Sequence, residues 1–376
     1  MKRRLLAVAA ALLLVGGAAG SAGATAAGSA PAAVASVQVP SGVTAGVAVF
    51  DRQTGAFTEQ FDASAPFRSA SVVKLLLALD FLWNRGPDYT VPAADRARLE
   101  PMLRGSDDDA ADYYWSTYGG SAIVNRMVSR LGLQDTAPPP SAYPGFWGYT
   151  AISARDTVAV YRYLLDSAPA PVRDFVMGNL RQSTRCASDG FDQHFGIAGA
   201  FDKPWAVKQG WAGSSYPEGT CTNATAAAAS TRVTAAAVDL TRPALHSTGT
   251  VGAGDRSIVA VYTLHPAGTS YGKAYTDIGR LTRSLDVPGA TRPGGWWYGT
   301  WSEHVNVRRD PSTGNAPMTQ LPAGVEVLIG CQKRGQEVQV PPYTNDWWAY
   351  LPQYGGWISN IYVSSPDNRI PDVREC

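Results

Sequence analysis

Residues 72–83 predict a helix that carries apolar side chains on nearly every side. The segment VVKLLLALDFLW contains only two charged residues, Lys74 and Asp80. A helix that is apolar all round lies inside a domain and not on its surface. The chain must therefore form a domain large enough to bury a whole helix, and its 376 residues, 45% of them apolar, can supply that core.

Strand-like and helical segments flank this buried helix along the chain. Residues 46–61, GVAVFDRQTGAFTEQF, predict a β-hairpin that turns at residues 52–55. We expect the first and last strands of this part to share one antiparallel sheet flanked by helices, with a helical subdomain between them, which is an α+β fold. The remaining helices are predicted at 97–105, 110–131, 153–165, 169–182 and 271–285, and the remaining strands at 205–211, 234–240 and 257–265. Ser153, with an acid three residues on at Asp156, is the predicted cap of the third of these helices.

A Gly/Pro-rich segment at residues 286–295, DVPGATRPGG, predicts a linker. Beyond it the composition changes to short strand-like runs separated by turns, among them VEVLIGC, WWAYL and IYV, which predicts a small β-barrel. We therefore expect two domains, one over residues 43–285 and a C-terminal one over residues 296–376.

The chain begins with the pattern of an export signal. Three basic residues at positions 2–4 precede an apolar run at residues 5–15 and a small-residue cleavage motif that ends at Ala24. A transmembrane anchor is the alternative, but it needs about 20 apolar residues. We favour a signal peptide over residues 1–24 and a disordered leader over residues 25–42. The expected product is secreted, extracellular or cell-wall associated, and free of the membrane after cleavage.

Charge and cysteine content argue against a nucleic-acid-binding or a metal-binding protein. The net charge of +1, with no block of like charges, argues against nucleic acid as a partner. The cysteines allow three pairings, of which the simplest joins neighbours on each side of the linker, Cys186 with Cys221 and Cys331 with Cys376. Metal binding is the alternative, but no C-x-x-C pair or suitably spaced His supports it. We expect no metal or cofactor.

Ser71 and Lys74 are the first candidate catalytic pair. Residues three apart share one face of a helix, and Ser71 would lie at the start of the buried helix, where free N–H groups favour a developing negative charge. A lysine in an apolar surrounding loses its proton more easily, so Lys74 could serve as a general base. Taken alone, the pair also fits a capping serine and a lysine whose ammonium reaches solvent.

Two further segments carry polar residues at unusual places. Ser106-Asp107-Asp108 precedes a predicted helix, where a capping role is the ordinary interpretation. Lys208 lies in the apolar strand WAVKQGW, where an edge strand could turn it to solvent. Gly210, two residues on, would let a substrate backbone approach closely.

Taken in this order, FRSASVVKLLLALDFL, MLRGSDDDAADYYW and WAVKQGW resemble the three motifs of the β-lactamase and penicillin-recognising superfamily of serine hydrolases. The resemblance is closest to the class A branch and covers about residues 43–285. It implies that Ser71 attacks a carbonyl carbon to form an acyl-enzyme, that Lys74 accepts the serine proton, and that Ser106 relays a proton to the leaving nitrogen.

The resemblance also assigns the substrate contacts. Lys208 would hold a substrate carboxylate and lower the pKa of Lys74 as a neighbouring like charge. The N–H groups of Ser71 and Trp211 would form an oxyanion hole. The remaining predicted contacts to a β-lactam or a D-amino-acid cell-wall peptide come from Asp108, Gln209 and Gly210.

The chain departs from the family pattern at three points. Asp108 replaces the usual Asn, and Gln209 replaces the usual Thr or Ser. The loop at residues 136–150 contains no Asp or Glu, although class A β-lactamases place there the glutamate that activates the deacylating water. Two alternatives to an efficient hydrolase therefore stay open. One is a penicillin-binding module with little turnover, and the other is a non-catalytic cell-wall-binding protein on a decayed hydrolase fold.

Residues 268–272, Gly-Thr-Ser-Tyr-Gly, match the nucleophile elbow of α/β-hydrolases. That elbow needs a parallel sheet built from βαβ units, which this segment lacks, so we interpret Ser270 as a turn residue. The only His after it, His304, belongs to the other predicted domain.

The C-terminal segments WSEHVNVRRDPSTGNAPMTQLPAGVEVLIGC and WWAYLPQYGGWISNIYV resemble a bacterial Src-homology-3-like domain. The resemblance implies contact with peptidoglycan. Core packing should account for at least half of its tryptophans, and exposed ones would form an apolar platform for a ligand. These are Trp296, Trp297, Trp347, Trp348 and Trp357.

Overall fold

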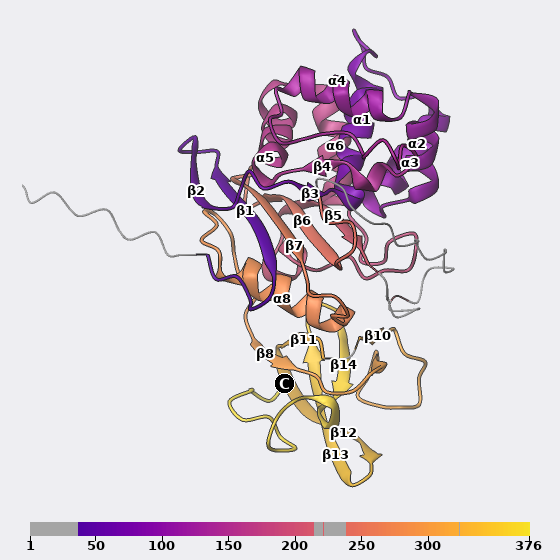
Figure 1. The fold of residues 1–376 in the computed structure, drawn as a ribbon. Coiled ribbons are helices and arrows are strands. Elements are labelled where there is room, and N and C mark those ends of the chain that lie inside the picture. The colour runs from indigo at the N-terminus through magenta and orange to yellow at the C-terminus, as the bar shows by residue number, and fades with distance from the viewer. Residues whose placement is uncertain (1–36, 214–220, 222–237, 323) are drawn as a thin grey trace, which may run out of the picture. The chain divides into compact units, whose positions relative to one another are not determined.

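The computed structural model describes residues 37–213, 221, 238–322 and 324–376 (Figure 1). The predicted signal peptide and residues 25–36 of the predicted leader lie outside this part of the chain. Within the leader, Val37 and Val39 are partly buried and pack against an apolar core. None of the described helices is long and apolar enough to cross a bilayer.

The body of the protein is built on one five-stranded antiparallel sheet (Figure 1). The predicted hairpin is confirmed, since two strands from the start of the body pair with each other. The first of them also pairs with a strand from the end of the body, so the prediction of one shared sheet is correct. In spatial order the strands are β2 (Ala56–Phe61), β1 (Thr44–Asp51), β7 (Ser257–Leu264), β6 (Ala244–Val251) and β5 (Trp205–Ala212).

Strand β6 was not predicted. The expectation of a strand at residues 234–240 is wrong for residues 238–240, which belong to no strand, and residues 234–237 lie outside the described ranges. All eight residues of β6 are buried, although half of them are polar. Hydrogen bonds make this possible, for example from Thr248 Oγ1 to the Lys208 carbonyl at 2.7 Å. A buried polar strand lacks the apolar alternation by which strands are recognised.

The helices begin and end close to the predicted positions. The apolar segment forms a 3-10 turn, η1 (Ala70–Val73), and then α1 (Lys74–Trp83), which is buried as far as Leu82. The segment 110–131 is split by Gly119 and Gly120, whose φ angles are 100° and 56°. The other helices are α2 (Ala93–Arg104), α3 (Asp108–Thr117), α4 (Ser121–Leu131), α5 (Ala154–Arg162), α6 (Ala170–Arg181), α7 (Ile197–Ala200) and α8 (Tyr271–Ser284).

Shorter elements complete the body. Two-residue strands β3 (Phe67–Arg68) and β4 (Ala151–Ile152) pair beside the buried helix. Ser153 caps α5 as predicted, because its side chain accepts a hydrogen bond from the Asp156 N–H. A 3-10 turn, η2 (Trp147–Tyr149), lies in the loop before β4, and a π-helical turn, η3 (Tyr163–Ser167), follows α5.

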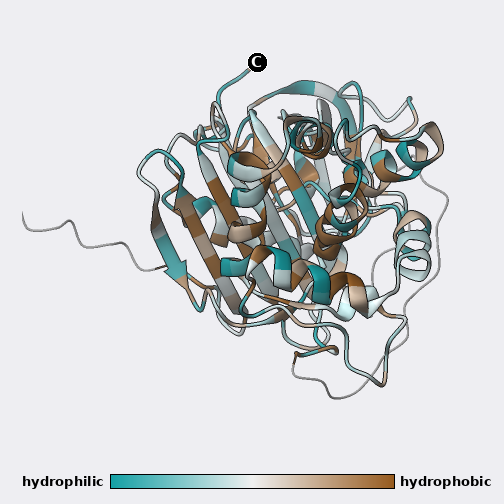
Figure 2. Cartoon of the chain, turned by 90° about the horizontal axis from the view of Figure 1, so that it is seen from above, coloured by the Kyte–Doolittle hydropathy of each residue, from teal (hydrophilic) through white to brown (hydrophobic). Residues whose placement is uncertain are grey.

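The two faces of the sheet bury separate cores. Ala206, Ile258 and Tyr262 point to the face covered by α1 and the other helices of the helical subdomain. Their neighbours Val207 and Val259 point to the opposite face, which α8 covers. Figure 2 shows apolar residues along the strands and on the helices packed against them. Because side chains alternate along a strand, the face that each residue of β5 presents is determined by its position.

The C-terminal residues form three small antiparallel sheets around a third apolar core. The predicted strand at residues 361–363 is wrong, because residues 360–362 form a 3-10 turn, η4 (Asn360–Tyr362). The pairs are β8 (Trp296–Gly299) with β11 (Glu326–Ile329) and β9 (Val305–Val307) with β10 (Thr319–Leu321), and the three-stranded sheet is β12 (Cys331–Val340), β13 (Tyr343–Leu351) and β14 (Gly356–Ser359). The Src-homology-3-like resemblance and the domain boundaries stay predictions.

Both predicted disulfides are present. Cys186 and Cys221 are joined with their Cα atoms 5.4 Å apart, and Cys331 and Cys376 with theirs 5.2 Å apart. Among the C-terminal tryptophans, Trp347 and Trp348 are buried and the other three named above are partly buried. The exposed one is Trp301, which the sequence analysis did not single out.

Candidate active site

Ser71 lies in η1, just before the buried helix, on a strained turn. Ala70, the residue before it, has a φ of 44°, which residues other than glycine rarely adopt. Gly210 of β5 packs against this turn, since a Cβ atom there would lie 2.9 Å from the Ser69 carbonyl oxygen. Gly210 was expected to let a substrate backbone approach closely. Because Gly210 has no side chain, β5 can pack directly against the turn that carries Ser71.

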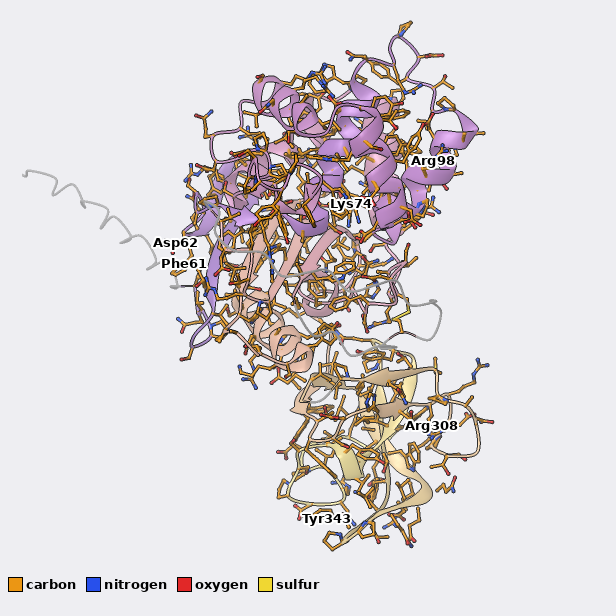
Figure 3. The ribbon with its side chains drawn as sticks, turned by 45° about the vertical axis from the view of Figure 1, so that its right-hand side comes forward. Phe61, Asp62, Lys74, Arg98, Arg308 and Tyr343 are labelled. Carbon is orange, nitrogen blue, oxygen red and sulfur yellow. A yellow bond between two sulfur atoms is a disulfide. The ribbon has the colours of Figure 1, made fainter. Side chains whose placement is uncertain are left out.

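Lys74 and Ser71 are in direct contact inside the protein. Lys74 Nζ donates to Ser71 Oγ at 2.9 Å, and Figure 3 shows Lys74 in the interior of the body. Lys74 is fully buried and Ser71 is only 6% exposed. Burial lowers the pKa of Lys74, although the Asp108 carboxylate opposes the shift. A lysine with this pKa shift is better able to take a proton from the serine hydroxyl.

The second motif closes over Lys74 from the helical subdomain. Lys74 Nζ donates to the Ser106 carbonyl at 2.6 Å and to Asp108 Oδ1 at 2.5 Å. Asp107 instead caps α3, with its carboxylate 2.8 Å from the Ala110 nitrogen. Asp108 is therefore the acid that faces the lysine, and its side chain is 61% exposed, so solvent reaches it.

Lys208 reaches the same point from β5. Its Nζ donates to Ser106 Oγ, and Lys208 is buried to 1% exposure. Burial, followed by the nearby Lys74 charge, lowers the pKa of Lys208 well below its usual range. Lys208 was expected to lower the pKa of Lys74, but burial is what lowers it, and the like-charge effect is seen instead of Lys74 on Lys208. Ser106 has a φ of 56°, a second strained backbone position at this point.

Gln209 does not join this group. Its side chain is on the opposite face of β5 from Lys208, because successive residues of a strand alternate. The Nε2 atom donates to the carbonyls of Gln193 and Phe195, at 3.0 and 2.6 Å. Its amide thus holds neighbouring backbone, and the N–H donors of Gln209, a predicted substrate contact, are already used within the protein.

The loop at residues 136–150 presents an aromatic ring to Lys74. The centroid of the Trp147 ring lies 4.6 Å from Lys74 Nζ, and its Nε1 donates to Asp112 Oδ1 at 2.6 Å. No carboxylate can come from this loop, because its sequence contains none. The position beside the lysine is therefore apolar on this side.

Asp189 is an acid near this group that the sequence did not indicate. Asp189 accepts from Trp211 Nε1 at 3.0 Å and from the Phe191 N–H at 3.0 Å. Burial raises the pKa of Asp189, and its charge acts on Lys74. The Trp211 ring also stacks on Phe191, with centroids 4.7 Å apart. The only sequence signal is the turn dipeptide Asp189-Gly190, which does not indicate what the loop contacts.

The Ser270 segment has a structural role. Ser270 caps α8, since its hydroxyl accepts from the Lys273 N–H at 3.3 Å. The sheet beside it is antiparallel throughout, so the βαβ setting of a nucleophile elbow is absent from the described sheet.

The chain is similar in sequence to a mycobacterial protein named as the lipoprotein LppW. In Mycobacterium tuberculosis and Mycobacterium bovis that protein is 39% identical over 175 residues, which are 45% of this chain and 54% of the relative. The chain thus spans about half the length of the curated relatives it matches. No protein-family model matches the chain.

Solved structures with a similar arrangement include PBP-A and two class A β-lactamases. PBP-A is 16% identical with a TM-score of 0.47, over 66% of this chain and 90% of that one. The class A β-lactamase of Mycobacterium abscessus is 18% identical with a TM-score of 0.45, over 64% and 92%. The one from Bacteroides cellulosilyticus is 14% identical with a TM-score of 0.47, over 64% and 90%.

Proposed function

We propose that the chain is an exported serine hydrolase that forms an acyl-enzyme at Ser71 with a β-lactam or a D-amino-acid cell-wall peptide. One observation carries the proposal. Ser71 Oγ and Lys74 Nζ are 2.9 Å apart in a buried setting, where Ser106 and Lys208 meet them from two other elements. A nucleophile in contact with a desolvated base is the arrangement that acyl transfer requires.

In the proposed reaction, neutral Lys74 takes the proton of Ser71 as Oγ attacks the carbonyl carbon. The N–H groups of Ser71 and Trp211 stabilise the oxyanion that forms. As the C–N bond breaks, Ser106 gives its hydroxyl proton to the leaving nitrogen. Ser106 is reprotonated from the lysine pair, since Lys208 already donates to its Oγ. The product of this half-reaction is an ester on Ser71.

Hydrolysis of that ester is the slow step of the proposed reaction. Water needs a base at neutral pH, and Trp147 lies beside Lys74 where the loop offers no carboxylate. Lys74 itself could serve again once it has lost its proton. We therefore expect an adduct that persists for minutes or longer, which favours a penicillin-binding module with little turnover over a rapid β-lactamase.

An exported location agrees with the cysteine chemistry. Both disulfides require an oxidising compartment, and the similarity to a protein named a lipoprotein also favours the cell envelope. We propose that the C-terminal residues contact peptidoglycan, for which the exposed Trp301 is the candidate surface residue.

Intact-mass measurement after incubation with benzylpenicillin tests the proposal. The expected result is one added penicilloyl mass, mapped to the peptide that contains Ser71 and lost slowly after the free drug is removed. Absence of any adduct over a range of β-lactams and D-Ala-D-Ala peptides would favour the non-catalytic alternative.

A further inference from the structure

The candidate active site brings together three chain segments, which carry Ser71 with Lys74, Ser106, and Lys208. One loop contacts two of them, the segment of Ser106 and the strand of Lys208. We name residues 183–196, between α6 and α7, the bridging loop. Its Ser188 N–H donates to the Gly105 carbonyl at 2.8 Å, and its Gln193 Nε2 donates to the Arg104 carbonyl at 2.8 Å. Arg104 and Gly105 directly precede Ser106, so the bridging loop holds the backbone from which Ser106 projects.

The same loop also holds β5. Gln193 and Phe195 accept hydrogen bonds from the Gln209 side chain, and Asp189 accepts one from the Trp211 ring nitrogen. Lys208 directly precedes Gln209 along β5 and lies three residues before Trp211. The bridging loop therefore fixes both partners of the Lys208–Ser106 contact relative to each other.

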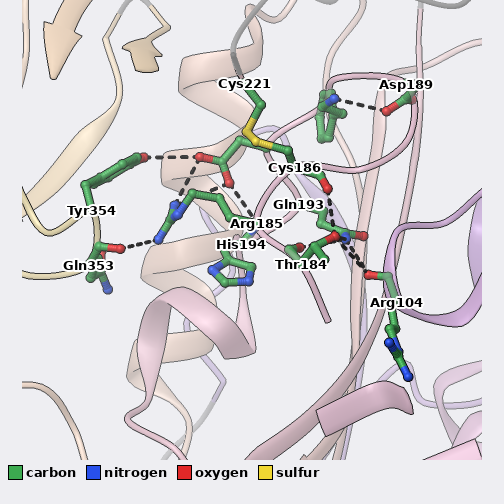
Figure 4. Close-up of a disulfide and its surroundings, with 12 residues drawn as sticks. Arg104, Thr184, Arg185, Cys186, Asp189, Gln193, His194, Cys221, Gln353 and Tyr354 are labelled. Carbon is green, nitrogen blue, oxygen red and sulfur yellow. Dashed lines mark hydrogen bonds and ion pairs between the residues drawn. A yellow bond between two sulfur atoms is a disulfide. The ribbon is translucent and has the colours of Figure 1, made fainter. Parts of the chain in front are cut away.

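On its other side the bridging loop binds the C-terminal residues through Arg185 (Figure 4). The Arg185 guanidinium donates to the Gln353 carbonyl and lies 4.2 Å from the centroid of the Tyr354 ring. It also forms an ion pair with Asp192 at 3.1 Å, and the Tyr354 hydroxyl donates to Asp192 at 3.4 Å. Gln353 Nε2 donates to the Gly199 carbonyl at 2.5 Å.

A covalent tie lies beside this ionic one. Cys186 of the bridging loop is bonded to Cys221, whose N–H donates to the Gly190 carbonyl at 3.2 Å. Cys221 also forms an isolated antiparallel bridge with Thr319 of β10. Two independent contacts thus connect one loop to the C-terminal strands.

We propose that Arg185 is a positioning residue for acylation at Ser71. It ties the C-terminal segment at Gln353 and Tyr354 to the bridging loop, and the loop holds Ser106 and β5 in place. The C-terminal residues are then part of the support of the active site and not only a separate binding module. The inference rests on the proposed function for its kinetic consequence.

The chemistry of arginine explains why this residue type is needed. A planar guanidinium can pair with a carboxylate, donate to a carbonyl and stack on a ring at the same time. A lysine offers one compact charge and can keep the Asp192 pair without the stacking or the second contact. Arg185→Lys should therefore preserve part of the effect.

The full-length chain offers a matched control. Arg280 of α8 also binds a C-terminal residue, Glu326 of β11, at 2.7 Å, but it does not contact the bridging loop. We would measure acylation by a fluorescent penicillin against its concentration in the wild type, Arg185→Gln, Arg185→Lys and Arg280→Gln. For Arg185→Gln we expect the maximal acylation rate to fall roughly 10–100-fold, because small misplacements of reacting groups cost this much. The half-saturating concentration should change less, Arg185→Lys should be intermediate, and Arg280→Gln should match the wild type.

Hydrogen exchange separates this inference from the proposed function. In Arg185→Gln, peptides covering residues 105–108 and 205–212 should exchange faster than in Arg280→Gln, whether or not the protein acylates. A wild type that never acylates would end the proposed function and leave this comparison intact. Equal exchange and equal acylation in Arg185→Gln and Arg280→Gln would overturn the inference. If Arg185→Gln does not fold, Tyr354→Ser takes its place because it removes the ring on which the Arg185 guanidinium packs, and unchanged exchange and acylation in that variant would count against the role of Arg185.

Discussion

The body of the protein and its C-terminal strands bury different kinds of polar group. Buried residues of the body include carboxylates, a guanidinium and two ammonium groups, for example Asp80, Arg68, Lys74 and Lys208. Among the described residues from 296 onward, the buried polar side chains are all uncharged, namely Thr300, Thr319, Gln332, Asn345, Ser359 and Asn360. Both regions have an apolar core of their own.

The buried side-chain amide of Gln332 in the C-terminal region is satisfied by the fold itself. Gln332 Nε2 donates to the carbonyls of Ile370 and Val373, both at 2.8 Å. Its Oε1 accepts from Asn360 Nδ2 and from the Ile370 N–H, at 3.0 and 2.9 Å. A buried amide with all of these bonds supports the structure and leaves no group for a reaction.

The buried charges of the body are mostly satisfied in the same way. Asp80, for example, lies between Arg126 and Arg130, at 2.5 and 2.8 Å. Lys208 is the exception, because it forms no ion pair within the described ranges and its Nζ donates only to uncharged oxygens of Ser106 and Gln209. An ammonium buried without a counter-ion is costly. Its presence beside a second buried lysine supports the active site proposed above.

The largest effect should come from removing the Ser71 hydroxyl, which lies beside the buried lysines. Ser71→Ala should abolish the adduct and lower any hydrolysis by at least about 1000-fold, because it removes the nucleophile. Intact mass and a chromogenic β-lactam provide the measurement. Ser270→Ala is the control and should behave as the wild type. An adduct on Ser71→Ala, or loss of activity in Ser270→Ala, would move the chemistry away from the buried lysines.

A carboxylate placed beside Lys74 should change turnover more than acylation. Trp147→Glu replaces the ring 4.6 Å from Lys74 Nζ with a possible base for water. We expect deacylation to rise by about 100-fold, within the range of general base catalysis. Adduct lifetime by mass spectrometry measures it. Trp301→Glu, at the exposed C-terminal tryptophan, is the matched control and should leave the lifetime unchanged. No acceleration in Trp147→Glu would show that a missing base is not what limits turnover.

Removing the disulfide of the body and removing that of the C-terminal region should have different effects on acylation. Removing either pair by Cys→Ser replacement should lower the free energy of unfolding by about 2–4 kcal/mol, since each closes a long loop. Only Cys186→Ser with Cys221→Ser should also slow acylation, because only that pair includes a residue of the bridging loop. Urea unfolding and labelling by fluorescent penicillin measure the two quantities. Equal loss of acylation in Cys331→Ser with Cys376→Ser would remove the distinction.

The smallest expected effect is a loss of folding stability as the pH falls. His246 Nε2 contacts the Arg68 carbonyl at 2.8 Å, and its Nδ1 accepts from the Thr263 N–H, so the ring has no place for a second proton. Burial, with the Arg68 charge, lowers the pKa of His246 to about 3. The unfolded chain binds this proton near pH 6.5 and the folded protein does not, so stability is complete above pH 6.5 and falls as the pH drops towards 3. Between pH 7 and pH 5 this amounts to about 2 kcal/mol.

Urea midpoints at pH 7 and pH 5 measure this loss. His246→Gln should reduce the difference between the two pH values, if necessary at the expense of stability at pH 7. His304→Gln, at an exposed histidine of the C-terminal residues, should leave the difference as it is. The same pH dependence in His246→Gln and the wild type would assign the acid sensitivity to other groups.

Local spacing was readable from the sequence because local geometry determines it. Ser71 and Lys74 are three residues apart at the start of one helix, and any such helix brings them to one face. The hairpin, the buried helix and the α5 cap depend on side chains within a few residues of one another, and they were predicted correctly. The cysteine pairs were also predicted, because each pair lies on its own side of the Gly/Pro segment.

Only the tertiary structure decided what reaches the site from far along the chain. The path of the bridging loop brought the carbonyls of Gln193 and Phe195 to the Gln209 side chain and Asp189 to Trp211. Trp147 reached Lys74 by the fold of a loop that has no periodic pattern. Strand β6 remained hidden because its buried polar residues are satisfied by partners such as the Lys208 carbonyl, 40 positions away. Contacts of this kind depend on register and loop path, which are set by the packing of the whole chain and not by neighbouring residues.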